Sequence, residues 1–380
     1  MTEWKTYRLK DVTSILGDGL HGTPVYDENG DVFFINGNNL ENGHINIKSN
    51  TKRVSTEEAA KYRKPLNDRT ILVSINGTIG NVGKYNNENC ILGKSACYFN
   101  VAEDFDYDFI YYVIANDIFK NTISRLATGT TIKNVSLETM RNYTFCAPDI
   151  TTQRRISKIL GAIDDKIVNN RRINDNLEQQ AQALYKQWFV DSSTVKLGDV
   201  VKTTSGGTPS RSHMEFYVGK YGWVKSKELN SSFITKTEET ITDDAIAKSA
   251  AKLLPAKSIL IAMYGATVGQ YAILSQPMTC NQAVCALLPN ENYPYTYLFM
   301  VAKNIKEELA NKAIGSAQQN ISQVIIKDID ISSDIEIIKQ FHKIVCPHFE
   351  VMEKNQKENE TLATLRDTLL PKLMNGEIKL

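Results

Sequence analysis

The sequence predicts an α+β fold in which two similar mixed α/β domains are held apart by two long helices that form an antiparallel coiled coil. Two observations predict this class. Segments of the first half of the chain recur in the second half. Each copy also ends in a stretch whose apolar residues repeat about every 3.5 positions, as in a helix that packs along another helix. Two such copies would be related by a pseudo-twofold axis.

Length and composition are those of a globular protein. A chain of 380 residues can form two domains with separate cores. No apolar run approaches the roughly 20 residues of a membrane span, and the first residues lack an apolar secretion signal. We therefore expect a cytoplasmic chain with no membrane partner. A net charge of +1 predicts a modest electrostatic attraction to nucleic acid, if any is bound.

Five segments carry the internal repeat along the chain. They are "RLKDVTSI" from Arg8 and "KLGDVVKT" from Lys196, "GTP" from Gly22 and from Gly207, "FFINGNNL" from Phe33 and "GWVKSKEL" from Gly222, "ILVSINGTIG" from Ile71 and "ILIAMYGATVG" from Ile259, and "GTTIKNVS" from Gly129 and "GSAQQNIS" from Gly315. The offset stays between 185 and 189 residues, which is too long for a solenoid repeat. The sequence therefore predicts two copies of one domain.

The elements follow in the same order in both halves. Residues 1–150 contain apolar β-type runs such as "VFFI" and "ILVSI" and predict a first mixed domain. Residues 151–190 predict a long helix. Residues 191–332 predict the second domain, and residues 333–380 repeat the helix. Pro347 predicts that this second helix begins late or kinks, because proline has no N–H to donate.

Both helices carry an apolar seam in two rows. The first helix has Ile156, Ile163, Asn170, Leu177 and Leu184 in one row, and Leu160, Ile167, Asn174, Ala181 and Trp188 in the other. An offset of 185 converts the rows into Phe341, His348, Asn355, Leu362 and Leu369, and into Val345, Met352, Asn359, Arg366 and Leu373. The partner of the first helix is therefore predicted to be its own repeat, running antiparallel.

Asparagines interrupt the middle layers of this seam. If the twofold axis passes between those layers, Asn170 faces Asn359 and Asn174 faces Asn355. A buried amide without a partner costs about 1–3 kcal/mol, so the polar layers are expected to fix the register of the helix pair. The alternative is that the helices splay apart there and water solvates the amides.

No complete catalytic, nucleotide-binding or metal-binding motif occurs in the sequence. "CILGKSA" ends like a phosphate-binding loop in Gly93-Lys94-Ser95, but Glu88 stands where the earlier glycine is required. The loops of an amine methyltransferase and the full motif of a metal nuclease are missing. The group formed by His342, Cys346 and His348 lacks a fourth zinc ligand. The sequence therefore predicts a binding and assembly protein that holds no metal or cofactor itself.

Polar loops at equivalent positions of the two copies differ in side-chain chemistry. Asn36 and Asn38 correspond to Lys225 and Lys227, which an extended segment would point the same way. Such side chains read base edges in the major groove or hold phosphates. The candidate DNA-binding residues are Thr23, Asn36, Asn38, Asn76, Thr78, Thr130, Thr131, Lys133, Asn134, Thr208, Ser210, Arg211, Lys225, Lys227, Tyr264, Thr267, Ser316, Gln318, Gln319 and Asn320. The alternative is that these loops are merely solvated connections.

The chain resembles the specificity subunit of Type I restriction–modification systems over essentially its whole length. The stretches that carry the resemblance are "TQRRISKILGAIDDKIVNNRRINDNLEQQAQALYKQWF", "IKQFHKIVCPHFEVMEKNQKENETLATLRDTLLPKLMNGEI", "SGGTPSR", "MYGATVGQ" and "GSAQQNIS". The first two resemble the helical regions of that family, and the others resemble elements of its target-recognition domains. The first copy departs from the pattern with "HGTPV", which leaves a role of His21 in DNA contact open.

The resemblance implies a DNA-reading subunit without a catalytic centre. Each recognition domain would read one half of a split target in double-stranded DNA, and the helices would set the gap between the halves. The helix pair would also dock two modification subunits, which carry S-adenosylmethionine and methylate adenine. Restriction subunits, which use ATP and Mg²⁺, would join that assembly.

Two other classes of protein remain as alternatives. A catalytic fusion enzyme is disfavoured by the missing methyltransferase and nuclease motifs. A DNA-mimicking inhibitor of restriction should be strongly acidic, whereas this chain has 44 basic and 43 acidic residues.

Overall fold

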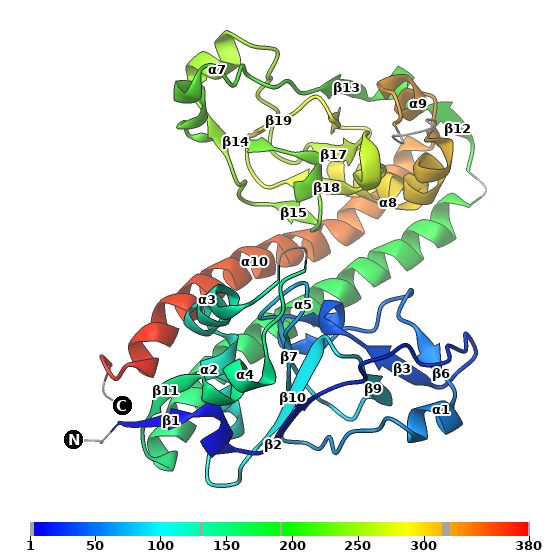
Figure 1. The fold of residues 1–380 in the computed structure, drawn as a ribbon. Helices are drawn as coiled ribbons and strands as arrows, with labels where there is room; N and C mark the ends of the chain where they lie inside the picture. Colours follow the sequence, from blue (N-terminus) through cyan, green and yellow to red (C-terminus); the bar gives the residue numbers. More distant parts are fainter. Residues whose placement is uncertain (1–3, 130–131, 191, 314–319, 379–380) are drawn as a thin grey trace. The chain divides into compact units, whose positions relative to one another are not determined.

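The computed structural model describes residues 4–129, 132–190, 192–313 and 320–378 (Figure 1). They form two compact units, one of residues 1–165 and 362–380 and the other of residues 166–361. Each unit contains one copy of the repeat together with parts of two long helices, α5 (Ile150–Phe189) and α10 (Ile335–Met374).

The first unit is a mixed structure of short strands and helices. Its strands are β1 (Lys5–Arg8), β2 (Thr13–Asp18), β3 (Val32–Ile35), β4 (Leu40–Glu41), β5 (His44–Ile45), β6 (Arg53–Val54), β7 (Thr70–Ser74), β8 (Val82–Lys84), β9 (Cys90–Leu92), β10 (Ala96–Val101) and β11 (Thr144–Ala147). Its helices besides α5 and α10 are η1 (Leu9–Val12), η2 (Gly37–Asn39), α1 (Thr56–Ala60), α2 (Tyr107–Ala115), α3 (Asp117–Leu126) and α4 (Leu137–Asn142). The strands form a four-stranded sheet in the order β2-β10-β7-β8, a three-stranded sheet in the order β6-β3-β9, and the pairs β1-β11 and β4-β5.

The second unit is assembled from corresponding elements. Its strands are β12 (Thr194–Lys196), β13 (Lys202–Ser205), β14 (Tyr221–Val224), β15 (Phe233–Ile234), β16 (Thr240–Ile241), β17 (Ile259–Ala262), β18 (Tyr271–Leu274), β19 (Thr279–Cys280), β20 (Val284–Leu288) and β21 (Asp330–Ser332). Its helices besides α5 and α10 are α6 (Leu197–Val200), η3 (Met214–Tyr217), η4 (Ser226–Glu228), α7 (Asp243–Ala247), η5 (Gly265–Thr267), α8 (Tyr295–Lys312) and α9 (Gln323–Lys327). The sheets are β13-β20-β17-β18-β15, β16-β14-β19 and β12-β21.

The strand pairing of the first unit returns in the second. β3 pairs in parallel with β9 and antiparallel with β6, and β14 pairs in the same way with β19 and β16. The central antiparallel pair of β7 and β10 returns as β17 and β20. Two different sequences thus form the same arrangement, which confirms the predicted class of two similar mixed domains with two long helices.

Both long helices begin at an aspartate cap. The Oδ1 atom of Asp149 accepts hydrogen bonds from the backbone N–H groups of Thr151 and Thr152 at 2.9 and 3.0 Å. Oδ1 of Asp334, which is 185 residues further on, accepts one from the N–H of Ile337 at 3.0 Å. These bonds satisfy N–H groups that have no partner inside the helix.

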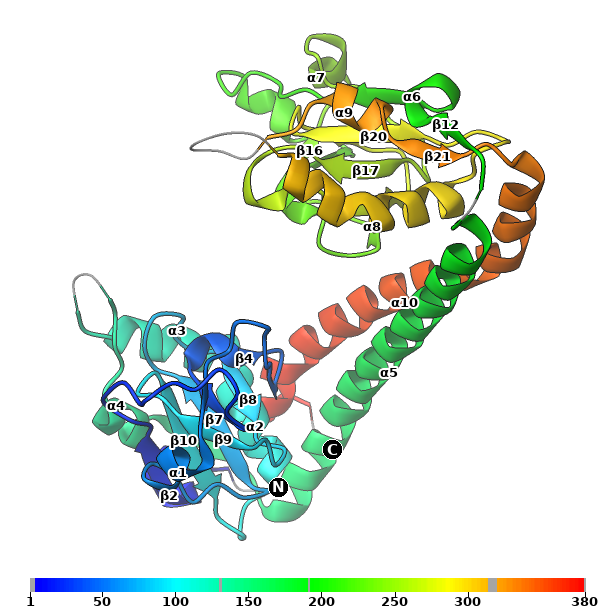
Figure 2. The same cartoon turned by 90° about the vertical axis from the view of Figure 1, so that its right-hand side faces the viewer.

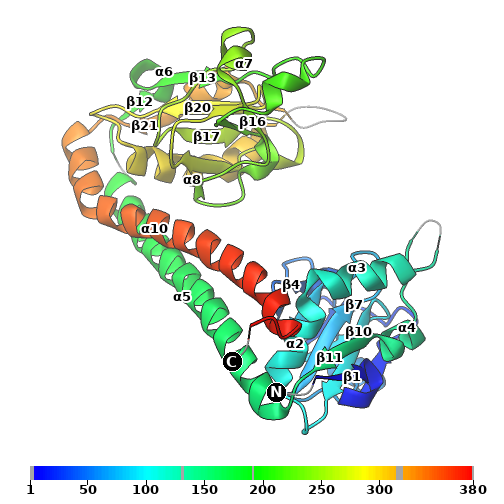
Figure 3. The ribbon, with the colours of Figure 1, turned by 90° about the vertical axis from the view of Figure 1, so that its left-hand side faces the viewer.

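α10 runs without interruption through Pro347, so the late start predicted from this proline is wrong. Figures 2 and 3 show that α10 instead changes direction within its orange first part. A proline inside a helix removes one N–H and crowds the preceding turn, which bends the helix without ending it.

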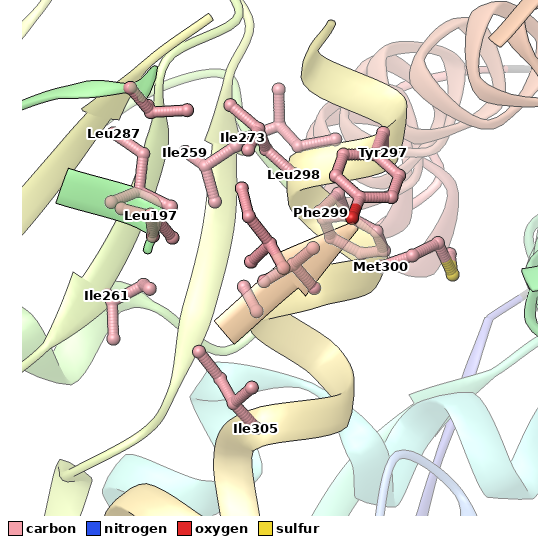
Figure 4. Close-up of a cluster of buried hydrophobic side chains, with 14 of the residues drawn as sticks. Leu197, Ile259, Ile261, Ile273, Leu287, Tyr297, Leu298, Phe299, Met300 and Ile305 are labelled. Atoms are coloured by element: carbon pink, nitrogen blue, oxygen red, sulfur yellow. The ribbon is translucent and has the colours of Figure 1, made fainter. Parts of the chain in front are cut away.

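The central sheets are buried on both faces. In the second unit Ile259 and Ile261 lie in a cluster with residues of α8, whereas the intervening Leu260 lies in a cluster with Val224 of β14. Figure 4 shows the first of these clusters, with Leu298 of α8 close to Ile259. Because neighbouring side chains of a strand point to opposite faces, a strand covered on both sides is apolar throughout. This explains the continuous runs "ILVSI" and "ILIAM".

The ends of the helices belong to the domain cores. In the first unit Ile156 of α5 and Leu373 of α10 are buried with residues of α2. In the second unit Phe341 of α10 and Ala181 of α5 are buried with residues of α8. Each domain therefore packs on the beginning of one helix and on the end of the other. None of the helices in the described residues has the length and apolar character of a bilayer-spanning segment.

Arg366 does not fit the predicted apolar seam. Its Nη1 atom donates a hydrogen bond to Oδ1 of Asp164 at 2.7 Å, and the hydroxyl of Tyr112 donates to Oδ2 of the same carboxylate at 2.7 Å. All three side chains lie in the first unit, so this layer is held by an ion pair that also ties the helices to α2.

Candidate nucleic-acid interface

The first candidate loop follows β3. The Oδ1 atom of Asn36 accepts a hydrogen bond from the hydroxyl of Ser95 at 2.9 Å, and the N–H of Asn36 donates to Oδ1 of Asn39 at 3.0 Å. Asn39 is buried and also donates to Thr51 and to the carbonyl of Asn46. These bonds fix the turn of η2, which leaves the side chain of Asn38 exposed at its tip.

A second loop follows β7 and meets a distant segment. The backbones of Asn76 and Asn134 form an isolated antiparallel bridge, and the N–H of Gly77 donates to the carbonyl of Lys133 at 3.4 Å. Gly77 has a φ of +76°, which favours glycine at this turn. Thr78 and Lys133 are exposed next to this bridge.

These loops meet at an open hollow of about 840 Å³ in the first unit. Three predicted residues, Asn36, Asn76 and Asn134, are among those that line it. His21 lines it as well and lies 2.6 Å from a carboxylate oxygen of Asp18. The structure thus brings together residues from four separate stretches of the first copy. Thr23 is exposed, two positions beyond His21.

Lys94 and Ser95 also line the hollow but were not predicted as DNA-binding residues. The sequence suggested only a phosphate-binding loop at this position, and that hypothesis was rejected because Glu88 replaces the glycine that the motif requires. The signal that could have found them is the repeat, because Lys94 precedes β10 as Gln282 precedes β20. Gln282 accepts a hydrogen bond from the hydroxyl of Thr208, which is a predicted residue of the second copy.

The second copy has the same framework with charged side chains. Lys225 precedes η4, as Asn36 precedes η2, and its N–H donates to Oε2 of Glu228 at 2.8 Å. Its Nζ lies 3.2 Å from a carboxylate oxygen of Glu238 and 3.2 Å from one of Glu239. Nζ of Lys227 lies 2.7 Å from the same oxygen of Glu238. The predicted extended segment is wrong, since residues 226–228 form a 3-10 helix, yet both lysines meet at Glu238.

Arg211 completes this charged cluster. Its two terminal nitrogens donate to the two carboxylate oxygens of Glu239 at 3.1 and 2.7 Å. The guanidinium carbon lies 4.0 Å from the ring centre of Tyr217 and 5.3 Å from that of Trp223. The indole N–H of Trp223 donates to the carbonyl of Gly207 at 2.9 Å. This bond ties the ring beneath Arg211 to the loop that carries Thr208. Hydrogen bonds from Arg211 and then from Lys225 lower the pKa of Glu239 to about 2.

The remaining predicted residues of the second copy that the structure describes lie in three loops. Tyr264 is exposed and its backbone forms a bridge with Asn320, as Asn76 does with Asn134 in the first copy. Thr267 donates to the carbonyl of Tyr264 at 3.0 Å, and the N–H of Gly265 donates to Oδ1 of Asn320 at 3.3 Å. Ser210 bonds Ser212 at 2.7 Å. Thr130, Thr131, Ser316, Gln318 and Gln319 lie outside the described residues.

The asparagine layers of the helix pair lie in the second unit. Nδ2 of Asn170 donates to Oδ1 of Asn359 at 2.9 Å, and Nδ2 of Asn355 donates to Oδ1 of Asn174 at 2.8 Å. These are the two pairs that the repeat predicts. Asn170 also donates to Glu358 at 2.8 Å, which lowers the pKa of that carboxyl group together with nearby Lys166. Asn170 is fully buried, so water does not solvate it as the alternative required.

His342 and Cys346 of the second helix have partners outside the group that they form with His348 in the sequence. Nδ1 of His342 lies 2.8 Å from the hydroxyl of Thr296, and Cys346 lies 3.6 Å from the hydroxyl of Tyr295. No group of three or more histidine, cysteine or acidic side chains in the described part of the chain is placed to hold a metal ion.

Comparisons with known proteins agree with this arrangement. The family described as "Type I restriction modification DNA specificity domain" matches residues 1–179 and 190–333. The specificity subunit of Type I restriction enzyme HindI from Haemophilus influenzae is 27% identical over 330 residues, covering 65% of this chain and 72% of that protein. The MjaIX specificity subunit of Methanocaldococcus jannaschii is 24% identical and covers 99% and 94%. The crystal structure of an S subunit from M. genitalium has a similar fold, with a TM-score of 0.61, 18% identity and coverage of 98% and 96%.

Proposed function

This chain belongs to the family of Type I restriction–modification specificity subunits, and we propose that each copy of its repeat reads one half of a split, asymmetric target in double-stranded DNA. A specificity subunit recognises the DNA sequence and has no catalytic centre, because catalysis belongs to partner subunits. The first recognition domain is residues 1–150 and the second is residues 191–332.

One observation carries this proposal: the two domains present different side chains on the same backbone. The loop after β3 presents Asn36 and Asn38, and the loop after β14 presents Lys225 and Lys227. Asparagine pairs well with adenine, whereas lysine donates to the O6 and N7 atoms of guanine. A shared framework with changed reading groups is what two readers of different half-sites require.

The helix pair offers a surface for the modification subunits. The antiparallel register that places Lys166 3.3 Å from Glu358 puts Ile173 opposite Val351 one heptad further along α5. Both of these apolar side chains are exposed. The same register puts Ile159 opposite Leu365 in the first unit, two heptads earlier along α5, and both of these side chains are exposed as well. Two matching apolar layers support the docking of two modification subunits, one at each layer.

The cofactors belong to those partners in this proposal. The modification subunits would carry S-adenosylmethionine, and restriction subunits would use ATP and Mg²⁺. A net charge of +1 supports this division, because most of the attraction to phosphates would come from the whole complex. The assembly would act in the cytoplasm, where the DNA lies.

A domain exchange tests the two-reader proposal. Residues 191–332 are replaced by the second recognition domain of a related specificity subunit, and the chimera is expressed with its modification subunits. The positions of methylated adenines in the cellular DNA then give the target. We expect one half of the target to change and the other half to stay the same.

The reciprocal exchange of residues 1–150 is the matched control and should change only the other half. A chimera in which both halves change together contradicts independent reading. Loss of methylation with an intact complex contradicts it as well, whereas loss of the complex itself shows in its size by gel filtration.

A further inference from the structure

The charged cluster of the second copy holds more carboxylate than a DNA-reading surface needs. It consists of Arg211, Lys225, Lys227, Glu238 and Glu239. Between 20% and 60% of the side-chain surface of its basic residues is exposed, so DNA can reach them. Carboxylates beside these cations repel phosphates, which makes their presence on this surface informative.

The first copy provides an internal comparison. The N–H of Trp223 donates to the carbonyl of Glu239 at 3.0 Å, and the N–H of Phe34 donates to the carbonyl of Lys52 at 2.9 Å. Lys52 therefore occupies the backbone position of Glu239, and Thr51 occupies that of Glu238. The two carboxylates are present only in the copy that also has lysines at the reading positions.

Stability alone does not account for this cluster. Ion pairs between exposed side chains usually contribute about 0–1 kcal/mol, and the first copy forms the same backbone arrangement with Thr51 and Lys52. The hydroxyl of Thr237 and the N–H of Trp223 bond to the carbonyl of Glu239, not to its side chain. The carboxylates can therefore be changed without removing a backbone contact that they make themselves.

The hydrogen-bonding geometry leaves donors available. Nζ of Lys225 has three N–H groups and lies near two carboxylate oxygens, so one donor remains. Arg211 has five N–H groups and uses two of them on Glu239. The aromatic rings of Tyr217 and Trp223 further restrict the guanidinium. Both cations are therefore held in place and still have N–H groups that can donate to another acceptor.

We propose that Glu238 and Glu239 are positioning residues that determine specificity in the second domain. They hold Lys225 and Arg211 so that their free donors meet acceptors on base edges, such as those of guanine. They also offset the charge that would otherwise attract these cations to the phosphates of any sequence. This inference rests on the proposed function, because it requires that the loop after β14 faces DNA.

The energetic consequence differs between the two kinds of complex. At the correct target the free donors bind bases while the carboxylates stay in contact with the cations. On other DNA the phosphates meet the same cations, but the adjacent carboxylates repel them, so a close phosphate contact requires the cation and the carboxylate to separate. Each phosphate contact formed in this way changes the slope of log K against log salt concentration by about 0.9. The carboxylates therefore weaken binding to incorrect DNA selectively.

The test uses the chain assembled with its modification subunits and measures binding over a salt series. One probe is a duplex that contains the methylated target, and the other is a duplex of equal length with the second half-site scrambled. For Glu238→Gln with Glu239→Gln we expect affinity for the scrambled duplex to rise roughly tenfold near 0.15 M salt, with a salt slope steeper by about two. Affinity for the target should stay the same or fall.

Two further variants complete the design. Glu238→Thr with Glu239→Lys introduces the residues of the first copy and should raise affinity for the scrambled duplex further. Glu307→Gln with Glu308→Gln removes two adjacent exposed carboxylates of α8 and serves as the charge control. It should change neither discrimination nor the salt slope by a comparable amount.

Three results overturn the inference. Affinity for the scrambled duplex could stay unchanged, both affinities could rise equally, or the α8 control could have the same effect. Separate substitutions of Lys225 and Lys227 by alanine distinguish these results from failure of the proposed function. If the alanine variants change binding and the glutamine variants do not, only the positioning role is wrong. If the alanine variants also have no effect, the reading surface itself is misplaced.

Discussion

Asn170 and Asn359 form an amide pair between α5 and α10, with Nδ2 of the fully buried Asn170 donating to Oδ1 of the half-buried Asn359 at 2.9 Å. The neighbouring pair repeats the contact with exchanged roles, since Asn355 of α10 donates to Asn174 of α5. Oδ1 of Asn170 has no hydrogen-bond partner in the described part of the chain. In Asn170 the amide nitrogen is therefore hydrogen-bonded and the amide oxygen is not. The unpaired oxygen lowers stability, whereas the bond to Asn359 favours this register of the helices over others.

Leucine at both Asn170 and Asn359 should stabilise the helix pair and loosen its register. Replacing both partners removes the unsatisfied buried oxygen, and Lys166 remains to pair with Glu358. We expect the free energy of unfolding to rise by about 1–2 kcal/mol in denaturant titrations, since two apolar side chains replace one buried and one half-buried amide. Methylation should then tolerate more than one gap between the half-sites.

The single change Asn359→Leu is the control for this pair. It leaves Asn170 buried with fewer acceptors, so the protein should be about 1–3 kcal/mol less stable than the double variant. A double variant with lower stability and an unaltered gap would show that the asparagines do not set register.

Lengthening both helices should lengthen the gap in the DNA target. Glu178 of α5 is bonded to Ser232 and Lys303 of the second domain, so an insertion near Asn176 would disturb that packing. Four residues are better inserted at the division between the compact units, after Asp165 in α5 and after Thr361 in α10. Four residues add about 6 Å, and the gap read from methylated adenines should grow by one to two base pairs. The half-sites should not change.

An insertion in α5 alone is the matched control and should abolish recognition, because it breaks the antiparallel pairing. An unchanged gap with full activity in the doubly lengthened protein would mean that the helices do not measure the distance.

Alanine at Lys225 and at Lys227 should give different signatures. Lys225 is held by two carboxylates, so its loss should cost about 1–3 kcal/mol at one base position and relax the preference there. Lys227 is the more exposed of the two, and its loss should weaken binding to all sequences and lower the salt slope by about one. Binding to single-substituted targets over a salt series separates the two effects. Identical signatures for both lysines would rule out this division.

Asp164→Asn should destabilise the first unit selectively. This carboxylate accepts from Arg366 and Tyr112, and its neutralisation leaves the partly buried guanidinium with the exposed Asp367 as its remaining ion-pair partner. We expect a loss of about 1–3 kcal/mol, seen as faster amide hydrogen exchange in α2 but not in α8. Tyr112→Phe removes one neutral donor and should cost about 1 kcal/mol or less. Equal acceleration in both helices would contradict a local role.

Lysine at both Ile173 and Val351 should remove one modification subunit from the complex. The two side chains are exposed apolar groups on opposite positions of the helix pair, and burying a charge there is unfavourable. The mass of the purified complex should fall by one subunit. Ile159 and Leu365 form the corresponding control pair, whose replacement should remove the other copy. A complex that keeps both subunits in either variant would show that these layers are not the docking surface.

The sequence alone determined the architecture because the chain contains an internal repeat of a domain and a helix. The repeat predicted two similar domains, and the offset of 185 predicted which asparagines meet, since the period of the seam fixes which side chains face a partner helix. These features depend on local periodicity, which a sequence shows directly. Asn36, Asn76 and Asn134 were predicted one by one as DNA-binding residues, but only the tertiary structure shows that they line one hollow.

Tertiary structure decided the contacts between segments that neither the internal repeat nor the helical seam relates to each other. Glu238 and Glu239 meet Lys225 only because β16 pairs with β14, and Lys94 reaches the hollow only because β9 pairs with β3. The sequence offers no reason for a charged Arg366 in the apolar seam, and the structure provides one in its hydrogen bond to Asp164. An ion pair forms between charged groups that lie close in space. Strand order and helix register set that distance, whereas separation along the sequence does not.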